Sequence, residues 1–203
     1  MKKIWIIAFG ALALALAMTG LAAMEAPRDV VRTTTDQVLT QVNSDRDALR
    51  ADPAKMYTLV ADVVFPHFDF PIMAQWVLGS NWKNASESAR NAFIEQFRKL
   101  LVRTYAAALL EFSNQPISYP DAAAAENSKT VLVLQEIEQP GGAPISLGYR
   151  LHKAGGSWKV FDVAVDGISL VKTYRASFAS IIDEGGMDAL ISSLNEKNKE
   201  ISQ

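Results

Sequence analysis

The stretch from Gly155 to Ile182 most constrains the fold, because it joins a strand to a helix with almost no linker. Bulky apolar residues occupy both faces of its extended part, a pattern typical of a strand that is covered on both sides. They are Trp158, Val160, Phe161, Val163 and Val165. After Asp166 and Gly167 the apolar residues recur at helical spacing, with Ser169 at the N-cap position. We therefore predict a buried last strand that passes directly into a helix.

The N-terminus predicts a secretory signal peptide. Lys2 and Lys3 precede an apolar run, and small residues up to Ala23 provide a cleavage site. We assign residues 1–22 to a cleavable signal peptide and residues 23–203 to a single domain. An uncleaved membrane anchor is the alternative, because the apolar run approaches the roughly 20 residues that a spanning helix needs. No cysteine follows the run, which excludes a lipoprotein anchor.

Composition narrows the chemistry. The 203 residues are 49% hydrophobic, which is enough for one substantial core. Removing Lys2 and Lys3 from the 20 basic residues leaves 18 against 22 acidic ones, so no nucleic-acid partner is expected. The chain has no cysteine and only two histidines, His67 and His152. We therefore expect neither a disulfide, nor a metal site, nor a cofactor.

Helical periodicity dominates the first half of the chain. Asp52 followed by Pro53 is an N-cap with proline at the first helical position, and Gly79 stops a later helix. The longest predicted helix, 86–112, carries an unusually wide apolar stripe. The other predicted helices span 27–43, 46–50, 53–64 and 71–78, and a last one follows Gly185 and Gly186.

Strands follow the helices. Pro116 and Pro120 bracket an edge strand, 129–138 alternates and is rich in valine, and 145–152 is extended. The turns at 140–142 and 155–156 connect these segments into an antiparallel meander. Helices, then strands, then helices predict an α+β fold, with a twisted antiparallel sheet of about four strands wrapped by helices.

Several polar residues suggest chemistry. Asp162, Asp166, Tyr174 and His152 carry the groups that acid–base catalysis requires in a cone-shaped α+β enzyme of the isomerase or dehydratase kind. In the structural alternative, Asp162 accepts hydrogen bonds and Asp166 forms the turn into the helix. The diglycines lack a following Lys-Ser or Lys-Thr, which makes them turns rather than phosphate loops.

The number of large apolar residues is high for a small domain. Periodicity alone does not tell a packed core from the wall of a cavity, and close packing is the more common arrangement. These large apolar residues lie on the predicted helices and on the faces of the sheet. Phe112 and Val131 are two of them, and the others are listed with the predicted pocket lining below.

Two sequence blocks carry a family resemblance. The first is W-K-V-F-D-V-x-V-x-G-I-S-L-V-x-x-Y-R-x-x-F, from Trp158 to Phe178, followed by G-G-M-D-A-L-I. The second is F-D-F-P-I-M-A-Q-W-V-L-G-x-x-W-K-x-A, from Phe68 to Ala85, followed by a helix that contains L-L-V-R-T-Y-A. Together they resemble the periplasmic phospholipid carriers of the MlaC (toluene-tolerance) family. The segment 113–145 follows the family pattern only loosely.

The resemblance implies a deep apolar pocket between the sheet and the helices. Its implied lining comes from both layers, and Tyr105 and Tyr174 are expected near the mouth. The implied lining residues are Met73, Trp76, Val77, Phe93, Phe97, Leu101, Tyr105, Leu109, Val133, Leu147, Tyr149, Trp158, Val160, Tyr174 and Phe178.

The resemblance also implies a function. It predicts a periplasmic phospholipid-binding shuttle of an intermembrane lipid transport system that maintains outer-membrane lipid asymmetry, with no catalytic residue and with phospholipid as cargo. The implied partners are an inner-membrane ABC transporter with a ring of lipid-binding domains and an outer-membrane complex of a lipoprotein and a porin.

Overall fold

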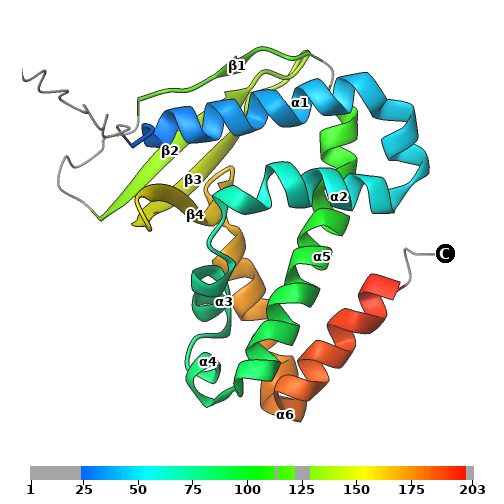
Figure 1. The fold of residues 1–203 in the computed structure, drawn as a ribbon, viewed down its shortest axis with the longest axis vertical. Helices are drawn as coiled ribbons and strands as arrows, with labels where there is room; N and C mark the ends of the chain where they lie inside the picture. The colour runs from blue at the N-terminus through cyan, green and yellow to red at the C-terminus, as the bar shows by residue number, and fades with distance from the viewer. Residues whose placement is uncertain (1–23, 113, 122–128, 200–203) are drawn as a thin grey trace, which may run out of the picture.

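The sheet is an antiparallel meander in which each strand pairs with its neighbours in the sequence (Figure 1). Its strands are β1 (Ile117–Ser118), β2 (Thr130–Ile137), β3 (Ile145–Ala154), β4 (Ser157–Val165) and β5 (Ile168–Ser169). The predicted α+β class is confirmed. The sheet has five strands where about four were predicted, because β1 and β5 are pairs of residues at its two edges.

The computed structural model describes residues 24–112, 114–121 and 129–199. The predicted signal peptide, residues 1–22, lies outside them. Within the described part of the chain, no helix combines the length and the apolar character needed to cross a membrane.

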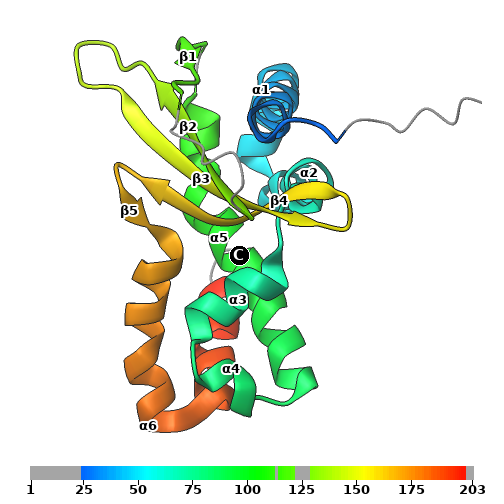
Figure 2. The same ribbon diagram turned by 90° about the vertical axis from the view of Figure 1, so that its left-hand side faces the viewer.

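The N-terminal part of the domain forms two helices. α1 (Pro27–Ala51) lies along one face of the sheet (Figures 1 and 2), and it continues through the break predicted near residue 44, with only a kink at Asp45. α2 (Pro53–Val63) begins as predicted, because the Asp52 carboxylate accepts a hydrogen bond of 2.9 Å from the Ala54 amide.

A short connection leads to the lower layer of helices. The 3₁₀ turn η1 (Phe65–His67) is followed by α3 (Phe70–Leu78) and α4 (Asn81–Asn84). Asp69 caps α3 by accepting a hydrogen bond of 3.1 Å from the Ile72 amide. Gly79 ends α3 with a φ of 57°, which favours glycine, and this agrees with the predicted stop.

Two long helices complete the fold. α5 (Glu87–Glu111) starts at Ser86, whose hydroxyl accepts a hydrogen bond from the Ala89 amide. α6 (Leu170–Lys199) is interrupted at Gly186, where φ is 74° and ψ is −171°. Its first arm descends from the sheet and its second arm returns beside α5 (Figures 1 and 2). The predicted helix end at the diglycine is therefore a bend between two arms.

The buried residues form three hydrophobic clusters. The helical cluster joins α3, α5 and α6 and comprises Phe70, Met73, Ala74, Val77, Leu78, Phe93, Phe97, Val171, Phe178, Leu190 and Leu194. The α1–α2 cluster comprises Val38, Val42, Leu49, Met56, Leu59, Val60 and Val102. The sheet cluster joins α1 to the sheet and comprises Val30, Val31, Val133, Leu151, Trp158 and Val160.

Candidate functional site

The structure distributes the predicted lining residues among these clusters. Trp76 is 54% exposed on the surface of α3, Leu109 packs against the α1–α2 cluster, and Tyr105 and Leu147 belong to no cluster. The residues that lie in the helical cluster or pack against it are Met73, Val77, Phe93, Phe97, Leu101, Tyr174 and Phe178. Those of the sheet cluster or packed against it are Val133, Tyr149, Trp158 and Val160.

The helical part of this set is held together by aromatic contacts. Phe93 and Phe97 are fully buried and stack with ring centroids 5.4 Å apart. Tyr174 on α6 meets Phe97 edge-on at 5.2 Å, and its hydroxyl shares a hydrogen bond with Tyr105 on α5. Burial raises the pKa of Tyr105 to about 12, and the neighbouring Tyr174 adds to the rise. These contacts fix the first arm of α6 against α5.

The sheet residues of the predicted lining face α1 instead. Val133 lies opposite Tyr149, and Leu151 lies opposite Val160, so these side chains project from the same face of neighbouring strands. That face packs on Val30 and Val31 of α1. We call it the α1 face.

A buried polar network crosses the same α1 face. Gln135 is 1% exposed, and its amide donates to the Thr35 hydroxyl at 3.1 Å and to the Tyr119 hydroxyl at 3.0 Å. Its carbonyl oxygen accepts a hydrogen bond of 2.7 Å from the Tyr149 hydroxyl. Burial raises the pKa of both tyrosines. The network ties α1 and the β1 edge to the sheet and leaves no atom of Gln135 unsatisfied.

The opposite side, which we call the α6 face, carries leucine and small residues next to the polar residues Arg150 and Asp162, and it is only partly covered. Leu132 lies opposite Arg150, and Leu134 lies opposite Gly148, which in turn lies opposite Ala164. Leu132 is 41% exposed. A Cβ atom at Gly148 would meet the Leu132 side chain at 3.4 Å and the Ala164 Cβ at 3.7 Å. Two small residues therefore lie in a leucine-lined surface, a combination that suits a flat apolar ligand.

The predicted lining does not include the residues of the α6 face. The sequence feature that indicates this face is the alternation of β2. Leu132 and Leu134 lie on one face of the strand, and Val133 and Gln135 lie on the other. Both sets of alternating residues in β2 are mostly apolar, so alternation alone did not indicate which face α1 covers.

The candidate catalytic groups are engaged in structural contacts, each with partners outside the candidate set. Asp162 accepts hydrogen bonds from the Ser169 hydroxyl at 2.7 Å and the Val171 amide at 3.2 Å. Asp166 lies in the turn with a φ of 48° and accepts from the Ser146 amide at 3.0 Å. His152 is 2.9 Å from the Asp69 carboxylate. The structural alternative for Asp162 and Asp166 therefore holds.

Hollows in the surface lie elsewhere. One, of about 500 Å³, lies between α1 and α2 and is lined partly by Asp45, Asp52 and Asp62. A second, of about 310 Å³, follows α1 near Asp36. Neither contains a residue of the predicted lining, so the deep apolar pocket stays a prediction. Among the residues that the structure describes, no cluster of three or more histidine and carboxylate side chains is placed to hold a metal ion.

The fold and this surface define an α+β protein in which one face of an open antiparallel sheet is covered by a helix and the other, which carries two leucines and two small residues, is partly exposed. The family model described as "MlaC protein" matches residues 32–196. The chain therefore belongs to the MlaC family.

Individual proteins agree with this assignment. Toluene tolerance protein ttg2D of Pseudomonas putida is 30% identical over 167 residues, which cover 82% of this chain and 77% of the relative. The intermembrane phospholipid transport system binding protein MlaC of Haemophilus influenzae is 26% identical over 173 residues, which cover 84% and 81%. The phospholipid-binding protein from Ralstonia solanacearum, solved in complex with a phospholipid, is similar with a TM-score of 0.81 and 31% identity. That similarity covers 88% of this chain and 100% of the solved one.

Proposed function

We propose that this chain is a phospholipid-binding carrier, rather than an enzyme, that moves lipid between the two membranes of the cell envelope. The observation that carries the proposal is the similarity, over 88% of the chain, to a protein solved in complex with a phospholipid. The name of the Haemophilus influenzae relative, a binding protein of intermembrane phospholipid transport, supports transport between membranes. The structural contacts of Asp162, Asp166 and His152, each with a different partner, argue against the isomerase or dehydratase alternative.

The physical requirement for such a carrier is large. A diacyl phospholipid has on the order of 30 methylenes, and each loses about 0.8 kcal/mol of favourable transfer energy when it is exposed to water. Lipid therefore crosses an aqueous compartment only inside an apolar site. Such a site needs close apolar contact and few polar groups, and it needs no catalytic residue.

The lipid site lies between the α6 face and the helical cluster. Its sheet wall is Leu132, Leu134, Gly148 and Ala164, which replaces the sheet residues first expected there. Its helical wall keeps Met73, Val77, Phe93, Phe97, Leu101, Tyr105, Tyr174 and Phe178. The partial exposure of Leu132 and the small side chains at 148 and 164 support the sheet wall.

The route of the carrier follows from the family. Residues 1–22 direct export and are cleaved, and the mature chain from residue 23 works in the periplasm. It collects or delivers lipid at an inner-membrane ABC transporter with a ring of lipid-binding domains and at an outer-membrane complex of a lipoprotein and a porin. Membership in the MlaC family supports these partners.

Lipid extraction tests the function. The protein is purified from the periplasm without detergent, extracted with organic solvent and analysed by mass spectrometry, beside an unrelated periplasmic protein treated in the same way. We expect phospholipid in near-stoichiometric amount from this chain only, because loss of acyl chains to water is slow. A protein that emerges without lipid and takes none up from vesicles contradicts the carrier function.

A further inference from the structure

One surface of the molecule combines exposed apolar side chains with unpaired cations. α3 and the first arm of α6 lie side by side (Figure 2). Trp76 on α3 is 54% exposed, and Ile168, immediately before α6, is 66% exposed. Exposed side chains of this size are informative when they occur beside charges of one sign.

The contacts of Arg175 connect the two helices at this surface. Its guanidinium lies against the backbone of Gly79, so close that a Cβ atom there would be 2.8 Å from Nη2. Gly79 ends α3 three residues after Trp76, so Arg175 contacts the end of the helix that carries the exposed tryptophan. Lys172 precedes Arg175 by three residues on α6 and is also exposed. We call Trp76, Ile168, Lys172 and Arg175 the basic–apolar face.

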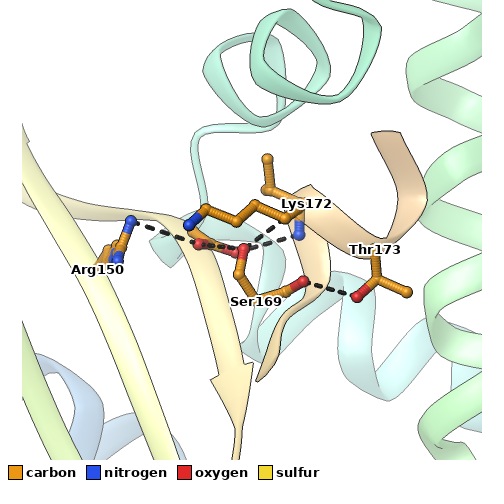
Figure 3. Close-up of polar contacts among 6 residues, drawn as sticks. Arg150, Ser169, Lys172 and Thr173 are labelled. Atoms are coloured by element: carbon orange, nitrogen blue, oxygen red, sulfur yellow. Dashed lines mark hydrogen bonds and ion pairs between the residues drawn. The ribbon is translucent and has the colours of Figure 1, made fainter. Parts of the chain in front are cut away.

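Lys172 and Arg175 are both exposed on this face. Among the described residues, no carboxylate forms an ion pair with Lys172 or Arg175. Arg150 on β3 is a further cation, and Figure 3 draws it together with Lys172 of α6. Arg150 Nη1 is 4.0 Å from Asp162, but that carboxylate is buried and already accepts two hydrogen bonds. Lys172 and Arg175 thus place two cations on the first arm of α6, and the nearest exposed carboxylate in the sequence is that of Asp166, two residues before Ile168.

We propose that the basic–apolar face docks on a bilayer surface that contains anionic phospholipid. Tryptophan is enriched at the level of the lipid head groups, and each lysine or arginine close to an anionic surface adds about fivefold in affinity. The face is formed by two adjacent helices, and the hollows of about 500 and 310 Å³ lie at α1 and α2 instead. A planar bilayer needs no hollow. The inference rests on the proposed function for its purpose, because docking brings the lipid site next to a membrane.

Vesicle sedimentation tests the docking. The protein is purified from the periplasm, and mass spectrometry establishes its N-terminal residue. It is then mixed with phosphatidylcholine vesicles that contain or lack phosphatidylglycerol. We expect binding to the anionic vesicles, and a loss of about 25-fold or more in the double variant Lys172→Glu, Arg175→Glu. The matched control is Arg50→Glu, Lys55→Glu, which makes the same charge change at the α1–α2 corner, away from α3 (Figure 1). This control should bind anionic vesicles within about twofold of the unchanged protein.

Fluorescence tests the role of Trp76 separately. Emission should shift to shorter wavelength on anionic vesicles, and the shift should be absent in Trp76→Phe. The inference is overturned if the unchanged protein ignores anionic vesicles, if both double variants weaken equally, or if the Lys172 and Arg175 variant binds normally. The inference would also be overturned if the unchanged protein bound an acidic protein and no vesicle, and if the Lys172 and Arg175 variant lost that binding. The face would then belong to that partner. Lipid extraction of the same samples separates the two proposals, because a chain without cargo can still dock.

Discussion

Asp162 joins the last strand to the helix that follows it. Its side chain is buried and accepts from the Ser169 hydroxyl and the Val171 amide, while the Ser169 hydroxyl accepts from the Lys172 amide at 3.1 Å (Figure 3). A carboxylate thus satisfies donors of the first turn of α6 and places negative charge at the positive end of the helix dipole. The residue that looked most like a catalytic acid therefore determines where the helix starts.

The variant Asp162→Asn tests this structural role. An amide keeps one acceptor, loses the other and removes the charge, so we expect a loss of about 1–3 kcal/mol in the free energy of unfolding. Urea unfolding measures the loss, and lipid extraction of the same sample should show unchanged cargo. Asp166→Asn is the control, since asparagine tolerates the positive φ there and the site is exposed, and its effect should be smaller. A stable Asp162→Asn protein with full cargo that no longer transports lipid would revive a chemical role.

The tyrosine pair between α5 and α6 predicts a pH dependence. Burial, with help from Tyr174, raises the pKa of Tyr105 from 10.0 to about 12. The folded state therefore holds this proton more tightly than the unfolded state, so the stabilisation is complete below pH 10 and is lost as the pH rises toward 12. We expect the free energy of unfolding to fall over this range and to fall less steeply in Tyr105→Phe. Equal slopes in urea unfolding at several pH values would contradict the assignment.

Helix boundaries depended on local chemistry and were largely predictable. Asp52 and Ser169 cap helices as expected, and Ser86, where the longest helix was predicted to begin, is also a cap. α1 ran past its predicted end because Asp45 permits a kink without ending the hydrogen-bonded helix. At the diglycine, the sequence identified the break in α6. It did not indicate that the second arm returns beside α5, because that depends on the burial of Leu190 and Leu194 in the helical cluster.

The bend in α6 predicts a stability effect. Gly186 has a φ of 74° and a ψ of −171°, a conformation that essentially only glycine adopts. Gly186→Ala should therefore lower the free energy of unfolding by about 1–3 kcal/mol. Gly142→Ala is the control, because it has no positive φ and a Cβ there would be 3.7 Å from its nearest neighbour. The strained bend is refuted if both alanine variants unfold at the same urea concentration.

At the scale of the whole molecule, the sequence predicted the layers but not their contacts. The α+β class, the meander and the family all followed from periodicity, turns and the two sequence blocks. Which face of the sheet α1 covers did not follow, because alternation shows which residues share a face and long-range packing decides what covers it. Val133 and Tyr149 contact the α1 side, and Trp76 lies on the outside of α3, for reasons that no local pattern contains.

The variants of Gly148 decide which face of the sheet holds the lipid. Gly148→Ala should fold and keep its cargo, because its Cβ would make ordinary contacts of 3.4 Å and more with Leu132 and Ala164. Gly148→Leu should also fold, but its larger side chain occupies the α6 face and should lower the phospholipid recovered by extraction severalfold. Val133→Leu adds a methylene on the α1 face, where we expect overpacking to cost about 1–3 kcal/mol without loss of lipid.

The opposite result is equally informative. If Val133→Leu loses its lipid while Gly148→Leu keeps it, the site lies on the α1 face, beside the sheet residues that the family resemblance first implied. Circular dichroism of each variant separates a blocked site from an unfolded domain. On the α6 face, Leu132 is partly exposed and lies beside the small residues Gly148 and Ala164, whereas the α1 face is filled by Val30 and Val31. A ligand of two acyl chains enters the face that protein side chains leave partly uncovered, so the α6 face should be the one that Gly148→Leu blocks.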